Sequence, residues 1–175
     1  MPTTTPLRIP VADLLKRPGA ARPEVVEALL ADLAGPGAAV PADRPVEVDV
    51  LLERVPDGIV VRGTVAAPWT AVCSRCLAPV EGRAAVHVDE LFEEHPLAGE
   101  TYQLGHEVVD LEPLVRDALL LELPGTPLCR ADCAGLCPEC GIDRNEATCE
   151  CTADELDPRW AALRSLDLEA LRGND

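Results

Sequence analysis

The densest group of chemically reactive side chains in the sequence is the run LCRADCAGLCPECGIDRNEATCEC at residues 128–151, which holds six of the chain's eight cysteines. Cys137 and Cys140 enclose two residues and are followed by Gly141. This spacing lets one turn direct both sulfurs at a single ion, and a CxC pair follows eight residues later. Four thiolates suit the closed tetrahedral coordination of structural zinc. The first predicted zinc site consists of Cys137, Cys140, Cys149 and Cys151.

The other cysteines predict a second zinc site. One CxxC pair lies between two predicted strands, and a second pair follows a predicted apolar helix more than fifty residues later. If that helix packs on the sheet, the two pairs can meet. The large separation leaves the grouping less constrained, and Cys133 could exchange roles with a member of the first site. The second predicted site consists of Cys73, Cys76, Cys129 and Cys133.

Other uses of these cysteines fit the pattern less well. A buried, unpaired thiol packs as a small hydrophobic group, which suits one or two cysteines, such as Cys129 or Cys133. A disulfide framework requires an exported protein, and a redox-active CxxC requires a thioredoxin-like βαβ setting that the sequence lacks. An iron–sulfur cluster with four cysteine ligands is chemically possible. Zinc is the preferred interpretation.

The sequence offers no convincing catalytic set. A zinc ion saturated by four sulfurs has no open position for a water molecule. His87, His95 and His106 lie in apolar or acidic contexts that favour sheet or surface roles over metal ligation. We find neither a glycine-rich phosphate loop nor a nucleophile beside a base. We therefore expect structural zinc, no enzymatic activity and no small-molecule substrate.

Composition and charge limit the class of protein. Hydrophobic residues make up 47% of the 175 residues, enough for a buried core, while aromatic residues make up only 2%. The formal net charge of -16 repels phosphate backbones and attracts basic partners. The first residues lack the pattern of a signal peptide, and no stretch approaches a membrane span. We expect a cytoplasmic protein whose thiols stay reduced.

The predicted fold class is α+β, with an antiparallel, barrel-like β-sheet, flanking helices and a small cysteine-rich zinc module. Period-two alternation in VEVDVLLERV (46–55) indicates a strand, PDG a turn, and IVVRGTV (59–65) a second strand. WTAVC (69–73) and AAVHVDELF (84–92) are interpreted as third and fourth strands. SRCLAPVEG connects them.

Helices are expected on both sides of this sheet. Proline at the start and glycine at the end of residues 23–35 indicate a short helix, although the segment could equally be a mobile arm. DLEPLVRDALLLELP (110–124) predicts a helix capped by Asp110, with an apolar stripe, and a last helix is expected in residues 157–171. The expected divisions are an N-terminal arm (1–45), a sheet with its packing helix (46–124), and the zinc module with the C-terminal helix (125–175).

An acidic run at residues 89–112 contains eight carboxylates and no Lys or Arg. A solvated loop is the commoner explanation of such a run, and a hard cation is another. Arg75, Arg83, Arg130 and Arg144 could form a local basic spot around the zinc turns, or lie as solvated surface residues. We expect the acidic run to bind a basic partner.

Several motifs together resemble the YceD family, the large ribosomal RNA subunit accumulation proteins of bacteria and plastids. They occur in the order VADLLKRPG, CSRCLAPV, DLEPLVRDALLLELP, the cysteine run and DPRWAALRSL. CAGLCPECG followed by Asn145 and a CxC is specific to the cysteine-rich branch, and Asp117 stands where Glu is expected. Shorter branches keep the first CxxC and lose much of the later cluster, so the later cysteines are not essential to the family's common function.

The resemblance implies a role in the production or stability of large-subunit ribosomal RNA and no known enzymatic reaction. We therefore expect a non-catalytic ribosome-biogenesis factor that supports the accumulation or processing of this RNA. Its expected basic partner is then a ribosomal protein or assembly factor, with ribosomal RNA contacted indirectly or through the arginines. A redox-sensing zinc-thiolate chaperone is the alternative, because closely spaced thiolates can oxidise and release the metal. A ribonuclease or RNA-modifying enzyme is disfavoured by the missing catalytic set.

Overall fold

The computed structural model describes residues 6–96 and 99–151. The chain divides into two compact units, with the boundary between Cys133 and Ala134. The divisions expected from the sequence were placed after residues 45 and 124. Within the described residues, no helix has the length and apolar character needed to cross a membrane.

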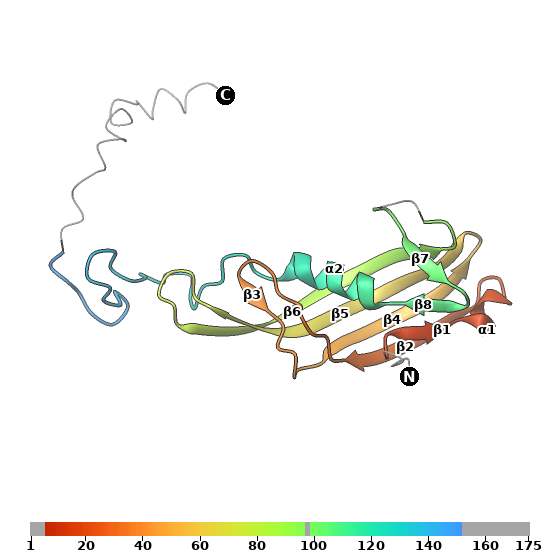
Figure 1. Cartoon of the computed structure of the whole chain (residues 1–175), viewed down its shortest axis with the longest axis horizontal. Helices are drawn as coiled ribbons and strands as arrows, with labels where there is room; N and C mark the ends of the chain where they lie inside the picture. Colours follow the sequence, from red (N-terminus) through yellow and green to blue (C-terminus); the bar gives the residue numbers. More distant parts are fainter. Residues whose placement is uncertain (1–5, 97–98, 152–175) are drawn as a thin grey trace, which may run out of the picture. The chain divides into compact units, whose positions relative to one another are not determined.

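The first unit is mostly strand, arranged as a curled half-barrel sheet with two helices (Figure 1). The order of its hydrogen-bonded strands is β1-β8-β7-β6-β5-β4-β2, and β3 pairs with β5. The helices are α1 (Ala12–Leu15) and α2 (Glu112–Glu122). The strands are β1 (Arg8–Pro10), β2 (Ala21–Ala28), β3 (Ala38–Ala39), β4 (Val46–Val55), β5 (Gly58–Val72), β6 (Pro79–Glu93), β7 (Tyr102–Gly105) and β8 (Val108–Asp110).

The hairpin of β4 and β5 confirms the predicted strand at 46–55 and the turn after it. Val46, Val48, Val50 and Leu52 are buried and alternate with exposed residues, as one buried sheet face requires. The separation of IVVRGTV and WTAVC into two strands is wrong, because both belong to β5. β5 tolerates Pro68, which has no backbone N–H, because this residue lies beyond the last β5 residue that pairs with β4. No backbone N–H donor is needed on the β4 side of the strand there.

The sheet is mixed, whereas the sequence analysis expected a fully antiparallel one. β6 pairs with β5 antiparallel over its whole length. β7 joins the other side of β6 in parallel, through Phe92↔Tyr102 and Glu93↔Gln103. A tight hairpin turn between β6 and β7 would have produced the opposite, antiparallel orientation.

The helix predicted in residues 23–35 is wrong. Residues 21–28 form β2, which pairs antiparallel with β4 from Ala21↔Glu53 to Ala28↔Val46. The N-terminal segment also supplies buried side chains to the main core, including Leu7, Val11 and Leu33. Glu, Ala and Leu in this segment have good helix propensity, but pairing with β4 overrides it.

The helix predicted in residues 110–124 is confirmed as α2. It buries Leu114, Val115 and Leu119, and it contacts β5 and β6 (Figure 1). The Asp110 carboxylate accepts a hydrogen bond of 3.1 Å from the N–H of Glu112, while the residue at the N-cap itself is Leu111. Because α2 packs on the sheet, it fixes where the chain leaves towards Cys129. The helix predicted in residues 157–171 lies outside the described residues.

Candidate metal centres

The first unit brings together the sulfurs of Cys73, Cys76, Cys129 and Cys133, all within 4.8 Å of one another. The first pair lies in the turn between β5 and β6, and the second lies in the segment that follows α2. The N–H of Ser74 donates to the carbonyl oxygen of Pro127 (2.8 Å) and links the two segments. Three of the four cysteines are buried, and Cys129 is exposed. The grouping is the one predicted from the spacing.

The second unit brings together Cys137, Cys140, Cys149 and Cys151, again within 4.8 Å. Cys137 is buried with an exposed fraction of 2%, and Cys140 is exposed. This grouping also matches the spacing argument. An isolated antiparallel β-bridge pairs Leu136 with Asp143, the residues on either side of the second CxxC turn, and closes that turn.

The two CxxC turns have the same backbone geometry. In the first, the N–H of Cys73 donates to Ala78 O (2.7 Å) and the N–H of Leu77 donates to Cys73 O (3.0 Å). In the second, the N–H of Cys137 donates to Ile142 O (2.8 Å) and the N–H of Gly141 donates to Cys137 O (2.9 Å).

The residue after each second cysteine has a positive φ, 62° at Leu77 and 73° at Gly141. Glycine adopts this conformation without strain, whereas leucine does not. The shared geometry outweighs the local preference of Leu77, which indicates that the turn shape is required at both sites.

The sulfur separations fit a tetrahedral ion. Cys73 Sγ lies 3.8 Å from Cys133 Sγ, and Cys76 Sγ lies 3.6 Å from Cys129 Sγ. A tetrahedron of thiolates at about 2.3 Å from its centre has edges of about 3.8 Å. Disulfide bonds require a much shorter sulfur separation of about 2.0 Å, and all eight cysteines are free. The donor set therefore suits a metal ion that takes four sulfurs.

In each tetrad one thiol ionises readily and another resists ionisation. Backbone N–H groups of Cys76 and Cys129 lower the pKa of Cys73 to about 6, and those of Cys140 and Glu139 lower the pKa of Cys137 to about 6.

The pKa of one other cysteine in each tetrad is raised. Loss of water around its sulfur inside the tetrad, followed by the neighbouring Cys76 thiol, raises the pKa of Cys129 to about 12, although the residue as a whole is exposed. The Cys140 thiol, followed by burial, raises the pKa of Cys151 to about 12. Four sulfurs in contact cannot all carry charge without a cation among them, and a divalent ion would favour all four thiolates.

Two arginines support the tetrads, a role that the sequence analysis missed. The guanidinium of Arg75 donates to Cys133 O (2.9 Å), and its backbone N–H donates to Cys73 Sγ (3.4 Å). The guanidinium of Arg144 lies 3.6 Å from Cys137 Sγ. The sequence could have indicated this role, because Arg75 lies inside one CxxC turn and Arg144 lies shortly after the other. A site of four thiolates carries excess negative charge and therefore attracts positive side chains.

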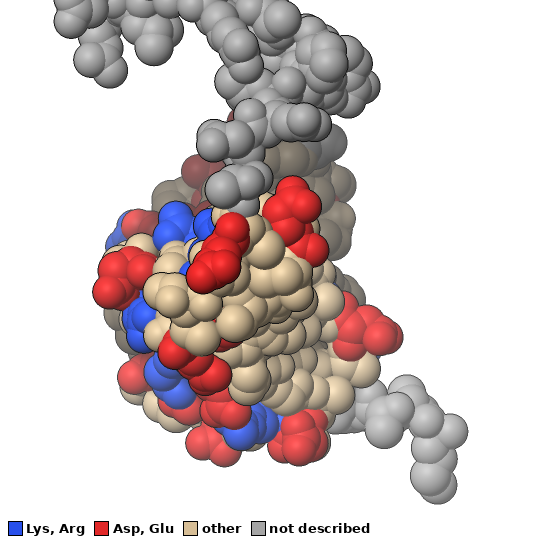
Figure 2. All heavy atoms as spheres, turned by 90° about the vertical axis from the view of Figure 1, so that its left-hand side faces the viewer, with Lys and Arg blue, Asp and Glu red and all other residues tan. Residues whose placement is uncertain are grey.

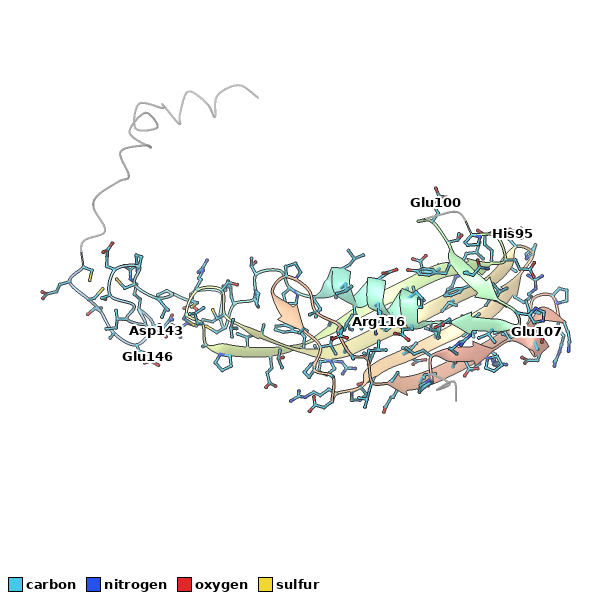
Figure 3. All side chains as sticks on the ribbon, in the orientation of Figure 1. His95, Glu100, Glu107, Arg116, Asp143 and Glu146 are labelled. Atoms are coloured by element: carbon cyan, nitrogen blue, oxygen red, sulfur yellow. The ribbon has the colours of Figure 1, made fainter. Side chains whose placement is uncertain are left out.

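Asn145, which carries part of the family resemblance, has a structural role in the second unit. Its Oδ1 accepts a hydrogen bond from the N–H of Ala134 (2.8 Å). Its own N–H and Nδ2 donate to Asp143 Oδ1, at 2.8 and 2.6 Å, and Asp143 is labelled in Figure 3. These bonds connect the two ends of the CxxC segment and orient its turn.

The other arginines proposed for a basic spot have acidic partners. Arg83 makes a two-bond ion pair with Glu47, at 3.0 and 2.6 Å, and Arg130 lies 3.3 Å from Asp132. On the face drawn in Figure 2, Lys and Arg side chains lie among Asp and Glu side chains. The described part of that face shows no separate basic patch.

The comparisons with known proteins place these features in a family. The family model described as "Large ribosomal RNA subunit accumulation protein YceD" matches residues 61–167, a range that contains all eight cysteines. An uncharacterized protein from Mycobacterium tuberculosis is 40% identical over 137 residues, which cover 73% of this chain and 66% of that protein. An uncharacterized protein from Mycobacterium leprae is 38% identical over 130 residues, covering 70% of this chain and 59% of that protein.

A plant protein is also similar. The "Large ribosomal RNA subunit accumulation protein YCED homolog 1, chloroplastic" of Arabidopsis thaliana is 33% identical over 58 residues, which cover 33% of this chain and 18% of that protein. The matches therefore span 66% or less of the length of these relatives. No solved structure matches the chain. The match of the family model to residues 61–167 shows that this chain belongs to the YceD family.

Proposed function

We propose that this protein is a non-catalytic ribosome-biogenesis factor that acts in the cytoplasm and supports the accumulation or processing of large-subunit ribosomal RNA. The observation that carries the proposal is the YceD family match over residues 61–167. The match spans β6, α2 and both cysteine tetrads, so it covers the parts that the fold uses to build its sites.

Zinc is the metal that we propose for both tetrads. Cys73, Cys76, Cys129 and Cys133 would hold one ion, and the four cysteines of the second unit would hold the other. Sulfur separations of 3.6 and 3.8 Å in the first tetrad support tetrahedral coordination. A bound zinc ion supplies a cross-link between distant segments, and its four sulfur ligands leave no position for an activated water molecule. The proposed role of the metal is therefore structural.

The partner that we propose is a basic ribosomal protein or assembly factor. Filling two tetrathiolate sites adds two negative charges at each site, which takes the formal charge from -16 to about -20. Such a charge opposes binding to RNA phosphates and favours basic proteins. At one end of the sheet, Glu93, Glu94 and Asp57 line a pocket together with Arg54 and His95, and His95 is labelled in Figure 3.

Salt dependence tests this partner class. The triple change of Glu93, Glu94 and Glu100 to Gln should weaken binding to a basic partner, and binding to the unchanged protein should weaken as salt rises. A control variant would neutralise three exposed carboxylates elsewhere, Glu27, Asp43 and Glu122. Tight binding to naked large-subunit RNA that the first triple change does not alter would overturn the partner proposal.

The cellular role is tested by complementation. Cells that lack the protein should have a lowered ratio of large-subunit to small-subunit ribosomal RNA, and the intact gene should restore it. An unchanged ratio in the deleted strain would contradict the proposed function. Zinc release by peroxide, accompanied by a gain in binding of unfolded proteins, would instead support a redox-sensing chaperone.

A further inference from the structure

One long edge of the sheet has almost no strand partner. β6 contains 15 residues, and β5 pairs with it from Ile59↔Phe92 to Val72↔Pro79. On its other side, β7 pairs only with Phe92 and Glu93. Within residues 6–96 and 99–151, no other strand pairs with β6. The edge from Pro79 to Leu91 is therefore open over roughly 40 Å. In Figure 1, β6 runs along the margin of the sheet until β7 joins it.

This edge lacks three of the features that protect exposed strands, although it carries the charged residues Glu81, Arg83, Asp89 and Glu90. Native edge strands are usually short, or carry proline, lysine or a bulge that prevents pairing. The other two sheet edges follow this rule, since β1 has three residues and contains Pro10, and β2 contains Pro23. Between Val80 and Leu91, β6 has no proline and no lysine. Its register with β5 is unbroken, so the strand has no bulge.

The backbone of β6 is also accessible to an added strand. In an antiparallel pair, about half of the residues direct their N–H and C=O groups away from the partner. The first half of β6 carries the small residues Gly82, Ala84 and Ala85, and the guanidinium of Arg83 among them is bonded to Glu47 of β4. An extended peptide adds as a further strand to an edge of this kind, where a regular row of backbone N–H and C=O groups lies next to small side chains.

An acidic pocket lies where the open edge meets β7. It has a volume of about 300 Å³ and is lined by Glu90 of β6, Tyr102 of β7 and Asp117 of α2, together with Gly99, Glu100 and Thr101. Glu100 is labelled beside β7 in Figure 3. The Tyr102 hydroxyl donates to Asp117 Oδ2 (3.0 Å), which orients the carboxylate. The three carboxylates at this pocket complement the positive head group of a Lys or Arg side chain.

We propose that the open edge of β6 binds an extended, basic segment of a partner protein as an added strand, with a Lys or Arg side chain of that segment in the Glu90–Asp117 pocket. The proposal rests on the proposed function for the basic character of the partner. A second copy of this chain is a poorer occupant, because two molecules with a formal charge of -16 repel each other.

The test uses the full zinc-loaded chain and a synthetic eight-residue peptide in which Lys and Val alternate. Nuclear magnetic resonance of the backbone amides should show shifts and slower hydrogen exchange in residues 80–91. A second peptide carries N-methyl groups on alternate residues, which removes its strand hydrogen bonds and keeps its charge. This peptide should bind at least about tenfold more weakly, because several backbone hydrogen bonds are lost.

Matched variants separate the pocket from general charge. The double variant Glu90→Gln/Asp117→Asn should weaken binding of the unmodified peptide several-fold more than Asp43→Asn/Glu122→Gln, which removes two exposed carboxylates outside the pocket. Equal affinity for both peptides, shifts that map to β2, or dimerisation through β6 would overturn the added-strand proposal. Binding of the basic peptide elsewhere on the protein would leave the proposed partner class intact. Binding of an RNA oligonucleotide with no binding of either peptide would contradict both proposals.

Discussion

The substitution Cys140→Ser probes how the second unit is held together. Among its described residues, 134–151, the one buried hydrophobic side chain is that of Cys137. Burying one small side chain contributes about 1–2 kcal/mol, whereas zinc binding to a small cysteine-rich module supplies about 10–16 kcal/mol. Loss of one of four ligands should therefore unfold this unit locally.

The expected effect is large enough for hydrogen exchange to measure. The N–H of Gly141 donates to Cys137 O, and the N–H of Arg144 donates to Gly135 O. Loss of only about 4 kcal/mol of the zinc contribution accelerates exchange of these amides about 1,000-fold. Amides of β4 and β5 should keep their protection, because the core of the sheet contains none of these residues.

Glu139→Gln is the matched control, since it changes an exposed side chain in the same turn and keeps all four ligands. Limited proteolysis should cut the Cys140→Ser variant within residues 134–151 and leave the control intact there. Unchanged protease resistance and unchanged amide exchange in Cys140→Ser would refute the reasoning.

Three further predictions concern single residues of the first unit. Burial and the Asp117 carboxylate raise the pKa of Tyr102, the single tyrosine, to about 12. The resulting stability is complete below the unfolded pKa of about 10 and is lost as pH rises through about 12. Phenolate absorbance should show ionisation near pH 12, and at a lower pH in Asp117→Asn, where burial still raises the pKa. Gly63 has a φ of 154°, and a Cβ added there would lie 2.1 Å from Asp49 O. Gly63→Ala should therefore lower the free energy of unfolding, measured in urea, by about 2–4 kcal/mol. An unchanged free energy of unfolding would contradict this close approach. Leu77 has a φ of 62°, which costs about 1–2 kcal/mol, so Leu77→Gly should melt at a higher temperature than Leu77→Ala.

The strands and cysteine groups that could be predicted have strong local patterns. The alternation of Val46, Val48 and Val50 identifies a half-buried strand without knowledge of its partners. The two CxxC turns are similarly local, and the grouping of the tetrads followed once α2 was expected to pack on the sheet. Metal ligation by these cysteines stays a prediction.

The features that could not be predicted depend on distant partners. Glu24, Glu27 and Ala28 have good helix propensity, whereas Val25 and Val26 favour a strand, and the pairing with β4 decides the outcome. The full length of β5 also depends on its partner, because β6 pairs with it from Ile59 to Val72, and the sequence does not show that continuous pairing. The parallel contact of Phe92 with Tyr102 depends on the path of the intervening chain, for which the sequence has no periodic pattern.

Zinc K-edge X-ray absorption, combined with metal quantification on the same chelator-free sample, tests the central claim most directly. The account predicts two zinc ions per chain, each with four sulfur neighbours at about 2.3 Å and no nitrogen or oxygen neighbour. Less than half an equivalent of zinc, a mixed sulfur–oxygen coordination shell, or the absorption of an iron–sulfur cluster would contradict it.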